Sequence, residues 1–193
     1  MNLYLVRHGA TLDNERKYFS GWTDNRLSEY GMEQARQLAA FFRRQVRKPF
    51  GLYCSDLKRA VCTAEIIGKM HKVGPIKSPL LRELNFGEWE GLSWEQISAS
   101  YAERSQLWLN DPYNHPPPGG ESLREMGIRI DLFLNNLLKP CLLARDNLVI
   151  THGGTIRLLL SKLLPPGNQR FWDLNINTAS ISLLSFSGGS LHS

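Results

Sequence analysis

An arginine and a histidine stand side by side near the start of the chain, as Arg7 and His8, directly after a short apolar run. The four apolar residues at 3–6 have the length of a buried strand, and Gly9 permits a sharp exit from it. Open α/β sheets bind ligands at the carboxyl ends of their strands. A guanidinium binds a phosphate dianion through a planar fork, and an imidazole can attack its phosphorus. The pair therefore suggests phosphate chemistry, although a single histidine at a strand end is more often structural.

A second stretch has the same design. Three apolar residues at 148–150 lead through Thr151 to His152 and Gly153. Two buried strands that each end in His-Gly can place both imidazoles around one anion. The alternative is a metal site with both histidines as ligands. It is the weaker interpretation, because arginines would crowd a cation and no third ligand stands at useful spacing. We therefore expect neither a metal nor a cofactor.

Two further motifs complete the set. Residues 55–60 read Ser-Asp-Leu-Lys-Arg-Ala and place Arg59 in the first turn or so of a predicted helix, where anions bind readily. A mid-chain Leu-x-Glu element ends at Glu83. These elements and the two His-Gly stretches stand in the order found in the histidine phosphatase superfamily. The chain resembles that family from about residue 3 to residue 186.

The resemblance implies a role for each of these side chains. His8 would attack phosphorus and form a phosphohistidine, which water then hydrolyses. Arg7, Arg59 and His152 would stabilise charge on the phosphate oxygens. Glu83 would protonate the leaving oxygen and later deprotonate the water. A proton-donor role for this carboxyl group needs an apolar wall, which Phe86 or Trp89 could supply.

The family's substrate-binding positions correspond here to Thr11, Asn14, Ser20, Gly21 and Gly153. Thr11 and Asn14 could donate to phosphate oxygens, or they could cap a helix. The Ser20-Gly21 pair is expected to line the substrate site and help set specificity, or else to form a polar turn. Ala10 replaces the acidic residue that is common in relatives, so any contact of that carboxylate is lost.

Composition fits an intracellular enzyme. The 193 residues suit one domain, and 42% apolar against 21% charged residues is typical of a soluble protein. The net charge of +5 comes from dispersed basic residues without a run of five, so we expect no nucleic-acid partner. No apolar stretch has transmembrane length, so we expect no membrane partner. Three cysteines without a Cys-x-x-Cys motif suggest reduced thiols and a cytoplasmic location. The oligomeric state is left open, with a homodimer as one alternative.

Alternating strands and helices predict an α/β fold, a three-layer α/β/α sandwich with a mostly parallel central sheet. Strands are expected at about 3–6, 51–54 and 148–151, with an edge strand at 180–186 and disorder in the last seven residues. Helices are expected at about 28–47, from a cap at Ser55 through Ile67, at 121–138 and at 155–164. Helix 155–164 should end at the Pro-Pro-Gly of 165–167.

The chain is expected to be one domain, 1–193, with a lid-like insertion at about 92–120. Aromatic residues are interleaved with polar ones there, and a Pro-Pro-Pro-Gly-Gly stretch follows at 116–120. Aromatic packing onto the domain is one interpretation. The other is a cover that shapes the pocket and selects the leaving group, and both can hold.

The function that these features favour is a metal-independent phosphomonoesterase acting on a small phosphorylated metabolite. A cofactor-dependent phosphoglycerate mutase is one alternative. Those mutases have a longer chain and a basic Asn-Lys segment soon after the loop that carries the glutamate, and residues 91–96 of this chain lack that segment. Within the family, the length and the elements at 54–60, 83–90 and 120–122 most resemble α-ribazole-phosphate phosphatases of cobalamin biosynthesis. A broad-specificity histidine phosphatase is the other alternative. A binding module with an inactive site is the distant one.

Overall fold

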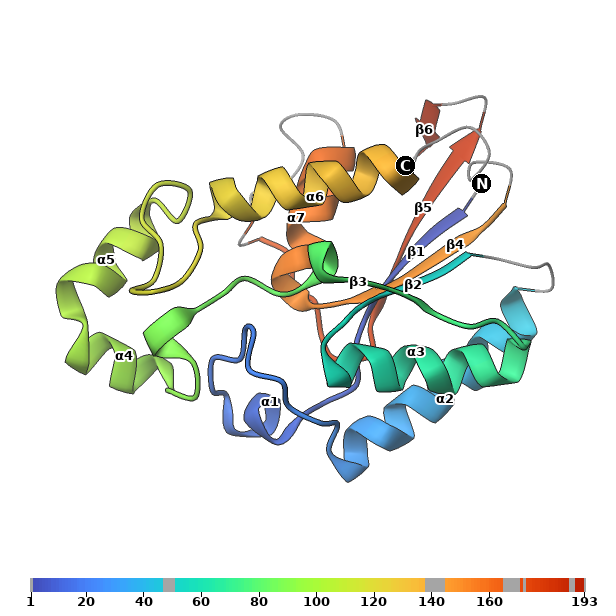
Figure 1. The fold of residues 1–193 in the computed structure, drawn as a ribbon, viewed down its shortest axis with the longest axis horizontal. Coiled ribbons are helices and arrows are strands. Elements are labelled where there is room, and N and C mark those ends of the chain that lie inside the picture. The colour runs from blue at the N-terminus through green and yellow to red at the C-terminus, as the bar shows by residue number, and fades with distance from the viewer. Residues whose placement is uncertain are drawn as a thin grey trace.

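A mixed sheet forms the centre of the molecule (Figure 1). The computed structural model describes residues 2–46, 51–137, 145–164, 171, 173–187 and 190–192. Within these residues the sheet has six strands in the order β3-β2-β4-β1-β5-β6. The strands are β1 (Asn2–Arg7), β2 (Gly51–Ser55), β3 (Ile76–Ser78), β4 (Asn147–Thr151), β5 (Ile181–Ser187) and β6 (Ser190–His192).

Strand direction brings the two His-Gly stretches together. β1 and β4 are parallel neighbours, and Arg7 pairs in register with Thr151. The next residue of each strand is a histidine, so His8 and His152 leave the sheet at the same edge. The His8 amide also donates to the Thr151 carbonyl, 3.0 Å away. Parallel pairs β2–β4 and β2–β3 extend the sheet on one side, while β5 and β6 add antiparallel strands on the other.

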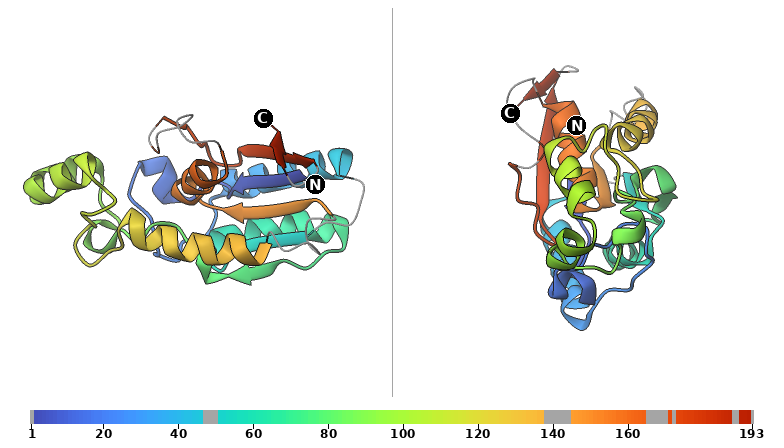
Figure 2. Two further views of the ribbon diagram at one scale, coloured as in Figure 1. Left: turned by 90° about the horizontal axis from the view of Figure 1, so that it is seen from above. Right: turned by 90° about the vertical axis from the view of Figure 1, so that its left-hand side faces the viewer.

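Helices cover both faces of the sheet and give the three-layer α/β/α sandwich that the sequence predicts (Figures 1 and 2). The side chains of β1 alternate between two cores. Tyr4 and Val6 face the layer of α2 (Glu29–Gln45) and α3 (Lys58–His71). Leu3 and Leu5 belong to the core beneath α6 (Leu123–Leu137) and α7 (Gly153–Leu163). Burial on both faces explains why the strands are uninterrupted apolar runs.

The region 92–120 contains two helices, α4 (Trp94–Ser100) and α5 (Ala102–Asn110). They extend beyond the carboxyl ends of β1 and β4 (Figures 1 and 2). Aromatic rings attach them to the domain, because Trp108 of α5 is 4% exposed and lies edge-on to the buried ring of Trp89. The remaining short elements are α1 (Leu12–Arg16) and the 3₁₀ turns η1 (Pro79–Leu81) and η2 (Gly87–Trp89).

Three local predictions were wrong. Ser55 does not cap α3, since it ends β2 and the cap position is Leu57, which makes no side-chain capping bond. Strand β5 is not at the edge, because β6 pairs with it. The same pairing gives residues 190–192 regular structure where disorder was expected. Helix α2 ends at Gln45 with Val46 as its C-cap, close to the predicted end near 47. One of the three cysteines, Cys141, and the Pro-Pro-Gly at 165–167 lie outside the described residues.

Glycine permits a close approach between α2 and the turn that follows β1. A Cβ atom at Gly31 would lie 2.0 Å from the carbonyl oxygen of Ala10. A Cβ at Gly9 would lie 2.3 Å from the carbonyl oxygen of Gly31. The Ser28 amide donates to the same Ala10 carbonyl at 2.9 Å, so the start of α2 holds the backbone just after His8.

We therefore expect Gly31→Ala to lower the free energy of unfolding by about 1–3 kcal/mol, because the new methyl group must push α2 away from this turn. Urea unfolding measures the change. Gly74→Ala is the matched control, since a Cβ at Gly74 would meet nothing within 4 Å, and its stability should equal or slightly exceed that of the wild type. Equal stabilities of the two variants would contradict this account of the packing.

Candidate active site

The ring of His8 is oriented by its own backbone. Its Nδ1 lies 2.7 Å from the carbonyl oxygen of Gly9, so Nδ1–H donates and Nε2 keeps its lone pair. The Arg59 Nε–H points at that Nε2 from 3.3 Å. Burial, the Arg59 guanidinium and the Arg7 guanidinium together hold the pKa of His8 well below 6.5. The imidazole is therefore neutral at neutral pH, which is the form that can act as a nucleophile.

His152 lies beside it and has unused hydrogen-bonding capacity. The centroids of the two imidazole rings are 5.0 Å apart. His152 is 1% exposed, and among the described residues neither of its ring nitrogens has a hydrogen-bond partner. Burial and the nearby cations, Arg59 first, hold its pKa well below 6.5. A buried polar ring without a partner is costly, so this position suits an added ligand oxygen.

Two guanidiniums, that of the buried Arg59 and that of the half-buried Arg7, complete the positive side of the site. Arg59 is 1% exposed, and its Nη atoms donate to the carbonyls of Gly21 at 2.6 Å and Thr23 at 2.7 Å. Arg7 donates through Nη1 to the Ile176 carbonyl at 2.6 Å. Burial lowers the pKa of both guanidiniums and the Glu83 carboxylate opposes that shift, but arginine remains a cation. Two desolvated cations beside two neutral imidazoles form an anion-binding site.

Glu83 is held at the edge of this site by backbone amides. Its Oε2 accepts from the Gly154 amide in the first turn of α7, and its Oε1 accepts from the Leu84 amide, both at 2.9 Å. The carboxyl group is 9% exposed and lines the same cavity as Arg7 and Phe86. Phe86 thus provides the apolar neighbour that the sequence suggested. Trp89, the other candidate, is fully buried in the core and does not line the cavity.

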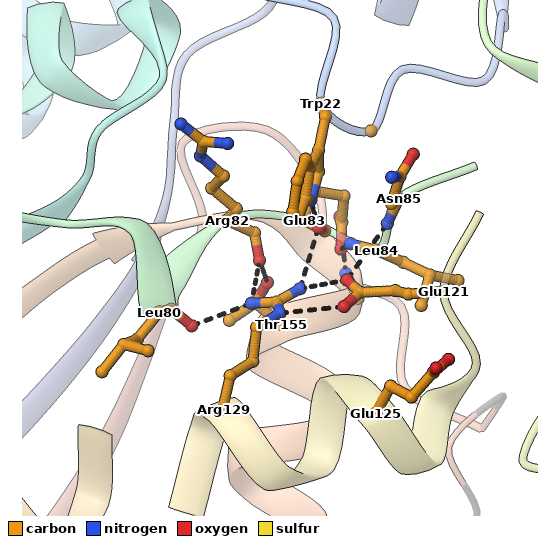
Figure 3. A network of polar contacts seen from close by, with 12 residues as sticks. Trp22, Leu80, Arg82, Glu83, Leu84, Asn85, Glu121, Glu125, Arg129 and Thr155 are labelled. Atoms are coloured by element: carbon orange, nitrogen blue, oxygen red, sulfur yellow. Dashed lines mark hydrogen bonds and ion pairs between the residues drawn. The ribbon is translucent and has the colours of Figure 1, made fainter. Parts of the chain in front are cut away.

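Arg129 of α6 fixes the segment that carries Glu83 (Figure 3). All five of its N–H groups are used, which is the full donor capacity of a guanidinium. Two pair with the Glu121 carboxylate, and the others reach the backbone carbonyls of Leu80, Arg82 and Glu83 at 2.7–2.9 Å. Arg129 was not among the functional residues predicted from the sequence. The available signal was its position three residues after Met126, on the stripe of α6 that faces the core.

The loop that begins at Ser20 is packed against the Glu83 segment. A Cβ at Gly21 would lie 2.2 Å from the carbonyl oxygen of Leu84, so only glycine permits this approach. The Glu90 carboxylate accepts from the amides of Trp22 and Thr23, at 2.7 and 2.5 Å. The Trp22 indole N–H donates to the Glu83 carbonyl at 2.9 Å (Figure 3).

The substrate-binding candidates fall into two groups around a cavity of about 680 Å³. Asn14 and Ser20 line that cavity together with Arg7 and Glu83. Thr11 is buried and forms a reciprocal capping box with Asn14, so its hydroxyl is engaged in starting α1. Gly21 and Gly153 do not line the cavity. Gly21 packs against the backbone at Leu84, and a Cβ at Gly153 would lie 3.5 Å from Arg7 Nε.

The family model of the histidine phosphatase superfamily (branch 1) matches residues 3–192. The chain belongs to this superfamily. The match does not single out one activity within the superfamily, because relatives with several different names match this chain over most of their length. Within the described residues, no helix is long and apolar enough to cross a membrane.

A protein of Hydrogenobacter thermophilus that is provisionally named phosphoserine phosphatase 2 is 32% identical to this chain, over 96% of this chain and 90% of its own length. The adenosylcobalamin/α-ribazole phosphatase of Salmonella typhimurium is 30% identical, over 98% and 92%. Other curated relatives are named 2,3-bisphosphoglycerate-dependent phosphoglycerate mutases. The crystal structure of the α-ribazole phosphatase from Shigella flexneri superimposes with a TM-score of 0.88 at 26% identity, covering 99% of this chain and 93% of that one.

The two neutral histidines of this histidine phosphatase make its stability depend on pH. Their pKa values in the folded chain lie below 6.5, so between those values and 6.5 the unfolded chain binds more protons. The free energy of unfolding should therefore fall as the pH drops below 6.5. Each histidine contributes a slope of up to about 1.4 kcal/mol per pH unit. Urea unfolding between pH 5 and 7.5 measures the slope of the free energy of unfolding against pH, which should be shallower in His152→Asn. An unchanged slope would mean that folding does not lower the pKa of His152.

Arg129→Lys should slow turnover by about 100-fold with a smaller change in KM. An ammonium has three N–H donors and cannot replace the five hydrogen bonds of Arg129, so Glu83 would shift from its position. Arg124→Lys on the same helix is the matched control. Arg124 is exposed and makes one side-chain hydrogen bond to Asn114, so this variant should keep wild-type kinetics. Steady-state phosphate release measures both. A rise in KM with kcat unchanged in Arg129→Lys would contradict a positioning role.

Proposed function

We propose that the chain is a phosphomonoesterase that works without a metal ion and through a phosphohistidine on His8. The observation that carries this proposal is the pair of neutral imidazoles 5.0 Å apart, with the buried Arg59 and the half-buried Arg7 beside them. A phosphate dianion would supply the negative charge that this arrangement lacks. It would also supply acceptors for the ring of His152 and for Arg7 Nε, both unpaired among the described side chains.

The first step transfers the phosphoryl group to the enzyme. The lone pair on His8 Nε2 attacks phosphorus in line, after the phosphate oxygens have taken over the Arg59 Nε–H that faces it in the free protein. Arg7, Arg59 and His152 stabilise charge on the equatorial oxygens. The bond from phosphorus to the leaving oxygen breaks, and that oxygen takes a proton from the Glu83 carboxyl group.

The second step returns the enzyme to its starting state. Glu83, now a carboxylate, removes a proton from a water molecule, which attacks the phosphorus of the phosphohistidine. The nitrogen–phosphorus bond breaks, and inorganic phosphate leaves with the oxygen of that water. His8 recovers its neutral form with the proton on Nδ1, where the Gly9 carbonyl holds it throughout.

For the substrate we propose α-ribazole 5′-phosphate, an intermediate of cobalamin biosynthesis. The names of the Salmonella relative and of the Shigella structure support this choice. The sequence elements at 54–60, 83–90 and 120–122 support it as well. Mutase action is the second candidate because relatives carry that name, although the basic segment of the cofactor-dependent mutases is absent after the glutamate loop. Catalysis takes place in the cytoplasm in this proposal.

The test is phosphate release, without added metal, from α-ribazole 5′-phosphate, phosphoserine, 3-phosphoglycerate and nucleotides. We expect α-ribazole 5′-phosphate to be hydrolysed fastest, and His8→Ala to reduce release from every substrate to background. Acid-labile, base-stable phosphate on quenched enzyme should disappear in the same variant. Undiminished turnover by His8→Ala would overturn the nucleophile assignment. Faster interconversion of 3- and 2-phosphoglycerate than phosphate release would instead identify a mutase.

A further inference from the structure

A second cavity, of about 340 Å³, lies next to the one that holds Arg7 and Glu83. The two cavities share three lining residues, Phe19, Glu83 and Phe86. Glu83 therefore borders both spaces. The volume of this second cavity is in the range of small-molecule pockets in proteins.

The walls of this second cavity are mainly aromatic. Trp94 of α4 and Trp108 of α5 line it together with Phe19 and Phe86. These rings support one another, with centroids 4.9 Å apart for Phe19 and Phe86 in edge-to-face contact and 6.3 Å apart for the two tryptophans. Aromatic rings packed in this way are rigid and favour a further ring placed edge-on or offset against them.

Among the described residues that line the cavity, Arg157 is the cation. Arg157 of α7 lines the cavity, and its guanidinium carbon is 5.8 Å from the ring centroid of Phe171, which also lines it. Arg157 Nε donates to the Leu174 carbonyl at 2.8 Å. A guanidinium held by a neutral carbonyl can bind an acceptor atom on a ligand with its other N–H groups. The cavity thus combines ring surfaces with one donor.

We propose that this cavity binds an aromatic leaving group of the substrate; the inference rests on the proposed phosphomonoesterase function and narrows its substrate class. Glu83 protonates the leaving oxygen, so that oxygen must touch Glu83 while phosphorus faces His8. The rest of the alcohol then extends past Glu83, into the space that the carboxyl group borders on its other side. A planar ring bearing an acceptor atom fits both the aromatic walls and Arg157.

Three simple esters test the assignment, because their alcohols have similar acidity and differ in the group beyond the second carbon. They are ethyl phosphate, 2-cyclohexylethyl phosphate and 2-phenylethyl phosphate. Burial of the phenyl ring should raise kcat/KM by about 10- to 100-fold over ethyl phosphate. Edge contacts with the cavity rings should favour phenyl over cyclohexyl by about 2- to 10-fold.

Leu109→Asp tests the location. Leu109 lines the cavity and is 44% exposed, so the substitution puts a charge at its edge without opening the core. The ratio of kcat/KM for the phenyl ester to that for the ethyl ester should fall at least about tenfold. Leu132→Asp on α6 is the matched control, since Leu132 is 53% exposed and outside both cavities, and it should keep the wild-type ratio.

The possible results distinguish failure of the leaving-group proposal from failure of the proposed phosphomonoesterase function. No phosphate release from any ester would overturn the proposed phosphomonoesterase. Release from all three at equal kcat/KM would leave that function standing and overturn the aromatic leaving group. Equal preference for cyclohexyl and phenyl would also overturn it, in favour of any apolar group. An unchanged ratio in Leu109→Asp would overturn the placement of the leaving group in this cavity.

Discussion

The structure depends on keeping two positive charges out of water without neutralising them. Arg7 and Arg59 are desolvated beside two imidazoles whose pKa values are lowered first by burial and then by repulsion from these cations. The result is a positive potential with few compensating groups, and a bound anion relieves it. Neutral histidine follows from the same constraint. The cations that would attract phosphate thus add to the effect of burial in keeping His8, the proposed nucleophile, unprotonated.

Rigid elements hold that unfavourable arrangement in place. The parallel pairing of β1 with β4 sets His8 beside His152, and the close contact between Gly31 and the Ala10 carbonyl fixes the turn that follows His8. On the opposite side, Arg129 uses every donor to fix the backbone at Glu83. The proposed catalytic histidines and arginines therefore lie at strand ends and helix starts. Glu83 lies on the segment between η1 and η2, which Arg129 of α6 holds in place. Core packing provides the free energy that the buried charges cost.

The sequence predicted strands β1, β2, β4 and β5, the layers, and five side chains that the fold brings together, because these depend on local patterns. It did not predict the short strands β3 and β6. An apolar run followed by His-Gly specifies both the strand and its end, and an arginine in a first helical turn already points to an anion. Prediction from local patterns failed where a side chain binds a segment that is distant in the sequence. Arg129 resembles any helical arginine until the carbonyls of a distant segment meet it. Ser55 resembled a helix cap, but the chain turns for two more residues before α3 begins. The capping of α1 by Thr11 was one of two stated alternatives, and only the fold could decide.

The partners of the arginines distinguish the two kinds of role. Arg129 and Arg82 are paired with carboxylates, those of Glu121 and Asp56, and each of those pairs is bidentate. Among the described residues, neither Arg7 nor Arg59 forms an ion pair, and both are held by backbone carbonyls. A dianionic phosphate can outcompete a neutral carbonyl for a guanidinium, because charge-assisted hydrogen bonds are roughly twice as strong as neutral ones.

A carboxylate would compete on more equal terms and would lower the affinity of the site. Carboxylate pairing thus fits arginines that must stay fixed, and carbonyl pairing fits arginines that must exchange partners during turnover. Arg157 belongs to the second group, since the Leu174 carbonyl holds it at the wall of the aromatic cavity. By this criterion the proposed ligand site extends beyond the phosphate. It would continue along α7, past the Gly154 amide that donates to Glu83, to the aromatic cavity proposed for the leaving group.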